Sequence, residues 1–134
     1  MIRWITGIAA ICMLSGVASA QEAIVAVDAT PQKSVFKGSV WNKPVIIKSN
    51  KDAAKHFKKD ALKALKKAVD FKKQFVLVFA WRGSGGDKLS YHVLESYPEQ
   101  IVFMRKPGTT KDLRSHAKVY ALRSNVKWSV KDKK

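Results

Sequence analysis

The chain has 134 residues, of which 26 are Lys or Arg and 10 are Asp or Glu, so its formal charge is +16. This length excludes a multidomain enzyme and leaves room for one small domain with short appendages. The single cysteine, Cys12, lies within the first twenty residues. If these residues are removed, the mature chain cannot hold a disulfide, a cysteine nucleophile or a cysteine metal site.

Residues 1–20 have the pattern of a signal peptide. Arg3 is followed by a mainly apolar stretch over residues 5–17 and then by Ala-Ser-Ala at residues 18–20, the small-x-small pattern that a signal peptidase reads. The apolar stretch is shorter than the roughly 20 residues that span a bilayer. An N-terminal helix buried in the domain is the alternative. We expect an exported protein, periplasmic or extracellular, with a mature start near Gln21 and no stable membrane span.

The mature chain is expected to have an irregular N-terminal arm over residues 21–43 and a single α+β domain over residues 44–130. The arm mixes short apolar stretches with a proline, a glycine and lysines, so it forms at most one weak strand. A β-branched run with a proline at its start predicts a short strand at residues 44–48. Ser49 follows as a helix cap, and with Asp52 it fits the capping box.

Residues 52–69 predict one amphipathic helix. Apolar residues, among them Phe57 and Leu65, recur at helical spacing on one broad face. Four lysines gather on the opposite face: Lys59, Lys63, Lys66 and Lys67.

Strands joined by short connections are expected after the helix. Residues 74–81 are apolar on both alternations, which predicts a central strand covered on both faces. The glycine-rich turn at residues 82–87 is expected to connect this strand to the next as a hairpin. The further strands are expected at residues 88–94, 101–104, 116–123 and 126–130, the last of them at an edge. Residues 131–134 form a basic tail.

This order predicts an α+β fold with one amphipathic helix packed on an antiparallel sheet of about five to six strands. The residues expected to be buried are Phe57, Leu65, Leu77, Phe79, Phe103 and Val119.

Two polar segments supply the candidate binding residues. The glycine-rich turn contributes Arg82, Ser84 and Asp87, and the segment before the strand at residues 116–123 contributes Asp112, Arg114 and His116. The turn lacks both phosphate-binding glycine patterns, although an anion can sit on its backbone N–H groups, and a plain flexible turn is the alternative. Arg82 and Asp87 flank the turn and are placed to pair across it.

Neither catalysis nor metal binding is favoured by the spacing of these residues. Ser84, Asp112 and His116 have the residue types of a hydrolytic triad, but Ser84 is not in a G-x-S-x-G elbow. The segment from Asp112 to His116 is better explained as a salt bridge or loop anchor. The three histidines, His56, His92 and His116, are too widely separated for a metal motif, so we expect no metal and no cofactor.

The basic excess favours a second interpretation. Lysines 59, 63, 66 and 67 form a patch that suits a polyanion, such as a nucleic acid, an acidic surface polymer or an anionic membrane. A solvated face on a secreted protein is the alternative, because lysine does not bind phosphate in the bidentate manner of arginine. No aromatic residues interleave with these lysines for base stacking.

Four segments carry a resemblance to known proteins: V-D-F at residues 69–71, W-x-G-S-G-x-D-x-L at residues 81–89, D-L-R-x-H at residues 112–116 and Y-A-L at residues 120–122. Because these four segments follow one another in this order, the chain resembles a group of small, uncharacterised exported bacterial proteins. More loosely, residues 45–130 look like the C-terminal domain of regulatory subunits of bacterial protease complexes, with Gly85-Gly86-Asp87 where that domain has T-G-G-Y. The resemblance implies an all-antiparallel, non-enzymatic, β-rich domain.

These observations lead to one expected function and one alternative. We expect an exported, monomeric, non-catalytic binding or accessory module that engages a protein or peptide through a sheet edge or the loop at residues 82–87. The alternative is a polyanion-binding protein that uses the lysine-rich helix.

Overall fold

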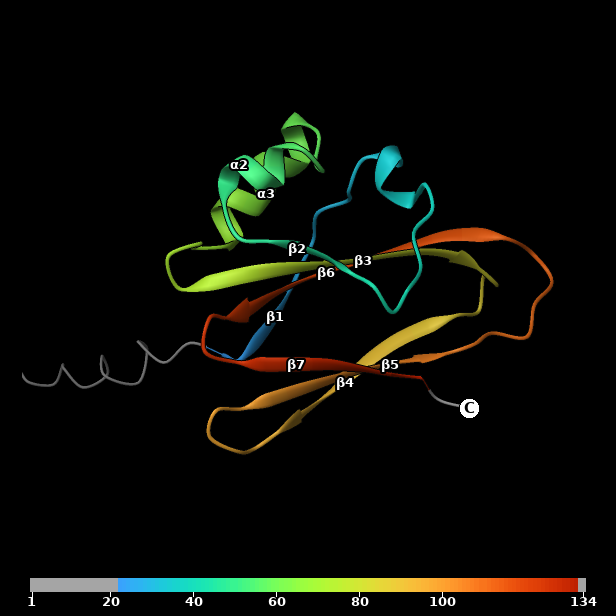
Figure 1. Cartoon of the computed structure of the whole chain (residues 1–134). Helices are drawn as coiled ribbons and strands as arrows, with labels where there is room; N and C mark the ends of the chain where they lie inside the picture. Colours follow the sequence, from blue (N-terminus) through green and yellow to red (C-terminus); the bar gives the residue numbers. More distant parts are fainter. Residues whose placement is uncertain (1–21, 133–134) are drawn as a thin grey trace, which may run out of the picture.

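The computed structural model describes residues 22–132 and has an α+β fold in three layers (Figure 1). Sheet A is antiparallel with strand order β1-β6-β3-β2, and sheet B has the order β4-β5-β7. The helices α2 and α3 lie over the face of sheet A that is turned away from sheet B. In chain order the elements are β1 (Ile24–Val27), the 3₁₀ helix η2 (Lys33–Phe36), β2 (Val45–Ile47), α2 (Asn50–Ala54), α3 (Lys59–Ala68), β3 (Gln74–Gly83), β4 (Lys88–Leu94), β5 (Gln100–Lys106), β6 (Arg114–Arg123) and β7 (Lys127–Asp132).

The signal peptide predicted at residues 1–20 lies outside the described residues. Between residues 22 and 132, no helix is long and apolar enough to cross a membrane.

The prediction of one continuous helix is wrong, because the segment is divided into α2 and α3. The cap is confirmed, since the Ser49 hydroxyl accepts a hydrogen bond of 3.1 Å from the Asp52 amide. The division follows from contacts with the N-terminal arm. Gln32 donates from its side chain to the Lys55 carbonyl at 2.7 Å and from its backbone to the His56 carbonyl at 2.9 Å. A continuous helix would use both carbonyls for its own hydrogen bonds.

Strand β3 is central in sheet A and buried on both faces, as the sequence predicts. It pairs with β2 on one side and with β6 on the other. Val76 and Val78 face the helices, whereas Leu77 and Phe79 face sheet B. All six residues that were expected to be buried are buried.

The predicted hairpin between β3 and β4 is wrong. The glycine-rich turn carries the chain from sheet A to sheet B, where β4 pairs with β5. Both edges of β3 are already occupied, and its apolar inner face needs a cover. Crossing to the second sheet supplies that cover, since Phe103 of β5 lies 4.6 Å from Phe79 between ring centroids.

The prediction of a single antiparallel sheet is also wrong. Strand β7 forms an edge as expected, but it runs parallel to β5. The chain passes through β6 in sheet A before it returns to sheet B, and this connection makes β5 and β7 parallel.

The segment expected to be an irregular arm contributes to the domain. Strand β1 pairs with β6 at the edge of sheet A, and Trp41 is buried between the sheets. Strand β7 extends to Asp132, so it includes the first two residues of the expected basic tail.

Candidate functional site

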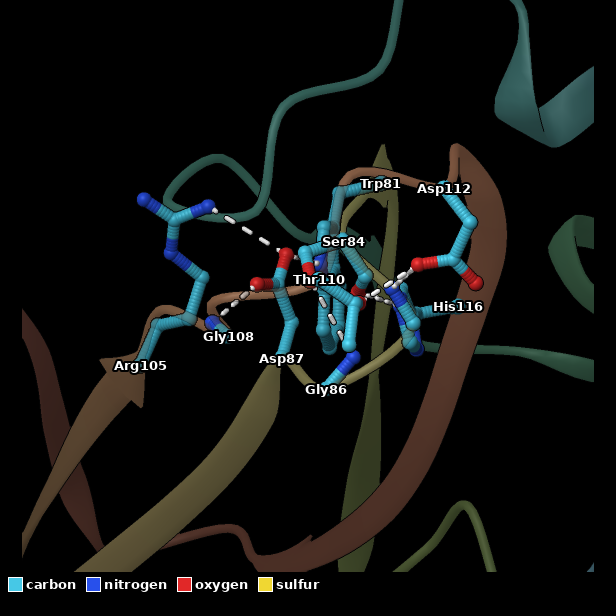
Figure 2. Close-up of polar contacts among 10 residues, drawn as sticks. Trp81, Ser84, Gly86, Asp87, Arg105, Gly108, Thr110, Asp112 and His116 are labelled. Carbon is cyan, nitrogen blue, oxygen red and sulfur yellow. Dashed lines mark hydrogen bonds and ion pairs between the residues drawn. The ribbon is translucent and has the colours of Figure 1, made fainter.

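The two polar segments singled out from the sequence meet at one end of the molecule. The turn after β3 (residues 84–87) and the segment between β5 and β6 (residues 107–113) are cross-linked by hydrogen bonds, and we call this region the loop junction (Figure 2). The Ser84 and Thr110 hydroxyls are 2.6 Å apart, and the Gly85 amide donates to Asp112 at 3.1 Å. The expected binding residues are therefore brought together by the fold, apart from Arg82.

Asp87 is the buried carboxylate of the loop junction, with 9% of its surface exposed. One of its oxygens accepts from the Gly108 amide at 2.6 Å, and the other accepts from the Trp81 indole at 3.1 Å. Burial raises the pKa of Asp87, but the hydrogen bonds from Gly108 and Trp81 and the charge of Arg105, 3.7 Å away, lower it more. The net pKa therefore lies below its usual value, and Asp87 is held as a carboxylate.

Asp112 is the exposed carboxylate of the loop junction. Hydrogen bonds from Thr110, from Arg114 at 2.6 Å and from the Gly85 amide hold its pKa well below the usual range. The contact with Arg114 is an ion pair, which confirms the salt bridge expected in this segment. Asp112 thus ties the glycine-rich turn to the start of β6.

His116 anchors the turn from the opposite side. Its Nε2 lies 2.7 Å from the Ser84 carbonyl oxygen, and its ring stacks on Trp81 with 4.9 Å between centroids. This contact is not that of a hydrolytic triad. His116 bonds to the main chain of Ser84, while the Ser84 hydroxyl contacts Thr110 and accepts from Gly86.

Arg82 lies apart from the loop junction. The expected pair between Arg82 and Asp87 is wrong, because Asp87 pairs with Arg105. Arg82 instead lines a groove of about 600 Å³ with Ser115 and residues of the segment around η2. Arg105 was missed from the sequence. It lies on β5, and its guanidinium is 5.5 Å from the centre of the Trp41 ring.

The loop junction is a structural clasp. Both carboxylates and the Ser84 hydroxyl are engaged in hydrogen bonds inside the protein. These bonds, buried at Asp87 and exposed at Asp112, hold the connection between the sheets in one conformation.

A second region, which the sequence did not reveal, has the form of a binding site. A groove of about 610 Å³ lies between the edge strand β2 of sheet A and the edge strand β7 of sheet B. We call it the β2–β7 groove. It is lined by Ile46, Lys48, Phe71, Gln74, Phe75, Ser124, Val126, Lys127 and Trp128.

The groove forms because sheet B does not cover the inner face of β2. Ile46 is paired in register with Leu77, which is fully buried between the sheets, yet 46% of Ile46 is exposed. Trp128 lines the groove from β7 and packs its ring against Phe103, with 6.5 Å between centroids. The sequence signal for this groove is that β2 has apolar residues on both of its faces, whereas a strand at a solvent-facing edge needs them on one face only.

The four lysines of the expected polyanion patch all lie on α3 and are exposed. Within residues 22–132, the three ion pairs all use arginine, and no lysine takes part in one. The helical layer therefore carries an uncompensated positive charge.

Among the described residues, no group of His, Cys, Asp and Glu side chains is placed to hold a metal ion. Comparisons with models of protein families, with curated proteins and with solved structures found no match to this chain.

Proposed function

We propose that the protein is an exported, non-catalytic binding module that takes an extended peptide segment of a protein partner in the β2–β7 groove. The observation that carries the proposal is the groove itself: an open, partly aromatic channel between two edge strands. Concave, mostly apolar channels with a few polar groups are the usual form of a ligand site.

The edge strands supply a reason to favour an extended peptide. Among the strands of residues 22–132, β2 pairs only with β3, and β7 pairs only with β5. Each therefore presents main-chain N–H and C=O groups that an added strand can pair with. Main-chain pairing would give affinity. Every second side chain of the bound peptide would point into the groove, where the exposed part of Ile46 and the ring of Trp128 offer contacts.

Charge indicates the chemistry of the peptide. Lys48 and Lys127 line the groove. In the part of the chain that the structure describes, neither forms an ion pair and no acidic residue lines the groove. A partner segment with apolar side chains and flanking carboxylates complements this surface and is attracted by the net positive charge of the chain.

A displayed library of random peptides, selected on the immobilised protein, tests the proposal. Peptides enriched on the protein are expected to combine apolar and acidic residues and to lose binding to Ile46→Asp. This substitution is at a half-exposed site and should leave the fold intact. Val93→Asp is the matched control, because Val93 is similarly exposed (39%) on β4, the opposite edge of sheet B. Selection of the same peptides by both variants would overturn the proposal.

The second candidate function, polyanion binding, is favoured by the unpaired lysines of α3. Heparin retention of Lys63→Glu/Lys66→Glu is the measurement that distinguishes a defined patch from net charge. If the patch binds, this variant elutes much earlier than one with two glutamates in place of the exposed Lys43 and Lys131, which has the same charge. Equal elution of the two variants would show that only net charge matters.

A further inference from the structure

At one end of sheet B, two lysines are placed directly opposite each other. Lys88 begins β4, Lys106 ends β5, and the two are partners in the antiparallel register. Like charges directly opposite on neighbouring strands are destabilising. Both side chains are exposed, and neither forms an ion pair with another described residue.

Neither acidic side chain of the two adjoining segments, 82–88 and 105–114, is available to neutralise this pair. The segments 82–88 and 105–114 contain six basic residues and two acidic ones. Asp87 is engaged with Trp81, Gly108 and Arg105, and Asp112 is engaged with Arg114 and the turn. These two segments therefore keep a net positive charge of four.

A cleft of about 330 Å³ lies beside the two lysines. It is lined by Gly86, Lys88, Lys106, Pro107, Gly108, Thr109 and Thr110, with no acidic residue among them. The amide and the hydroxyl of Thr109 have no hydrogen-bond partner within the described residues, so both donors are available to a ligand.

Two glycines allow the loops beside the cleft to pack backbone against backbone. A Cβ on Gly86 would project toward the Thr109 amide nitrogen, 3.9 Å away, and toward the Gly108 Cα, 3.3 Å away. A Cβ on Gly108 would overlap the Gly86 backbone. The two backbones therefore lie against each other, and the hydrogen bonds of the loop junction in Figure 2 hold them in place.

We propose that this cleft is a binding site for a tetrahedral oxyanion, a sulfate or phosphate group. The two ammonium groups offset its charge, and the Thr109 amide and hydroxyl donate hydrogen bonds to its oxygens. The bound group removes the repulsion between Lys88 and Lys106, so binding stabilises the ends of β4 and β5 as well. The site is independent of the β2–β7 groove and does not rest on the proposed peptide-binding function.

Titration of the full chain with sodium sulfate and with sodium phosphate, at constant ionic strength set by sodium chloride, tests this site. The amide resonances of Gly86, Gly108 and Thr109 are expected to shift and saturate. Lys88→Gln and Lys106→Gln should each weaken binding at least about fivefold, the effect of one lost charge-assisted contact. The double control Lys63→Gln/Lys66→Gln removes twice the charge from α3 and should leave the dissociation constant within about twofold.

A stability measurement keeps the proposal testable if the resonances overlap. In chloride, Lys88→Gln is expected to raise the melting temperature because it relieves the repulsion, and sulfate is expected to stabilise the unsubstituted chain more than this variant. The proposal would be overturned if the amide shifts do not saturate, or if Lys63→Gln/Lys66→Gln weakens anion binding as much as Lys88→Gln does.

A sulfated disaccharide titrated in parallel identifies the source of the anion. Tighter binding than inorganic sulfate indicates a polymer, and equal binding indicates the free ion.

Discussion

The indole of Trp81 donates a hydrogen bond of 3.1 Å to the Asp87 carboxylate, although the two residues lie on opposite sides of the crossing between the sheets. Trp81 is on β3 of sheet A, and Asp87 precedes β4 of sheet B. The bond closes the glycine-rich turn between them, and Gly108 and Arg105 add contacts from the end of β5. A single carboxylate thus joins three segments that the two sheets must bring together.

Asp87→Asn is expected to destabilise the protein by about 1–3 kcal/mol near neutral pH. Gly108 and Trp81 donate to different oxygens of the carboxylate. An amide replaces one of these oxygens with an NH₂ group, so asparagine keeps only one of the two hydrogen bonds and loses the charge that pairs with Arg105. Urea unfolding of both proteins measures the loss. Asp28→Asn, at an exposed carboxylate, is the control and should change the free energy by less than about 0.5 kcal/mol.

The same substitution should flatten the acid limb of the stability curve. Because the pKa of Asp87 is lowered in the folded protein, its contribution is fully present above the ordinary value of 3.8 and is lost as the pH falls through the lower folded value. The unfolding free energy of the unsubstituted chain should therefore drop below about pH 4 more steeply than that of Asp87→Asn. Parallel curves for the two proteins would contradict this assignment.

His116→Ala is expected to loosen the turn rather than unfold the domain. It removes the contact with the Ser84 carbonyl and the stacking on Trp81, at a cost of about 1 kcal/mol. Amide hydrogen exchange should become faster at residues 84–87 while sheet A remains protected. His92→Ala, at an exposed site on β4, should leave the exchange of this turn unchanged.

Leu77→Ala is expected to lower the free energy of unfolding by about 2–5 kcal/mol, the range for a buried leucine. Leu77 is fully buried between the sheets, on the central strand β3 of sheet A. Chemical denaturation measures the change. Val40→Ala, where 47% of the residue is exposed, should cost less than about 1 kcal/mol. A loss below about 0.5 kcal/mol at Leu77 would contradict the central position of β3.

Lys63→Glu/Lys66→Glu is expected to leave stability unchanged or to raise it by a few tenths of a kcal/mol. On α3, Lys63 is four residues from both Lys59 and Lys67, so glutamate there turns two repulsive spacings into attractive ones. Its spacing of three from Asp60 becomes repulsive, which keeps the net gain small. Thermal unfolding at low and high salt checks the result, because the gain should shrink as salt screens the charges. A large loss of stability at both salt concentrations would show that these lysines have a structural role.

Local sequence was sufficient to predict the elements whose pattern depends on near neighbours. The double-sided burial of β3 follows from seven consecutive apolar residues, 75–81, which occupy both faces of the strand. The cap at Ser49 follows from a contact between residues three apart. The ion pair of Asp112 with Arg114 joins residues two apart, and it too could be predicted from the sequence.

Features that depend on distant contacts could not be predicted in this way. The helix is divided because Gln32, some 23 residues earlier, takes the carbonyl of Lys55. The groove exists because β2 extends beyond the cover of sheet B, and the cleft exists because Lys88 and Lys106 meet in register.

The sequence by itself determined an α+β chain with a doubly buried strand, a basic helical surface and a glycine-rich turn. Only the tertiary structure decided that this turn crosses between two sheets instead of closing a hairpin. The physical reason is that local patterns specify which faces must be buried but not which surface buries them. The inner face of β3 is covered by Phe103 and its neighbours, which lie more than twenty residues away in the chain. The arrangement of covering strands then decides where the clasp, the groove and the cleft are formed.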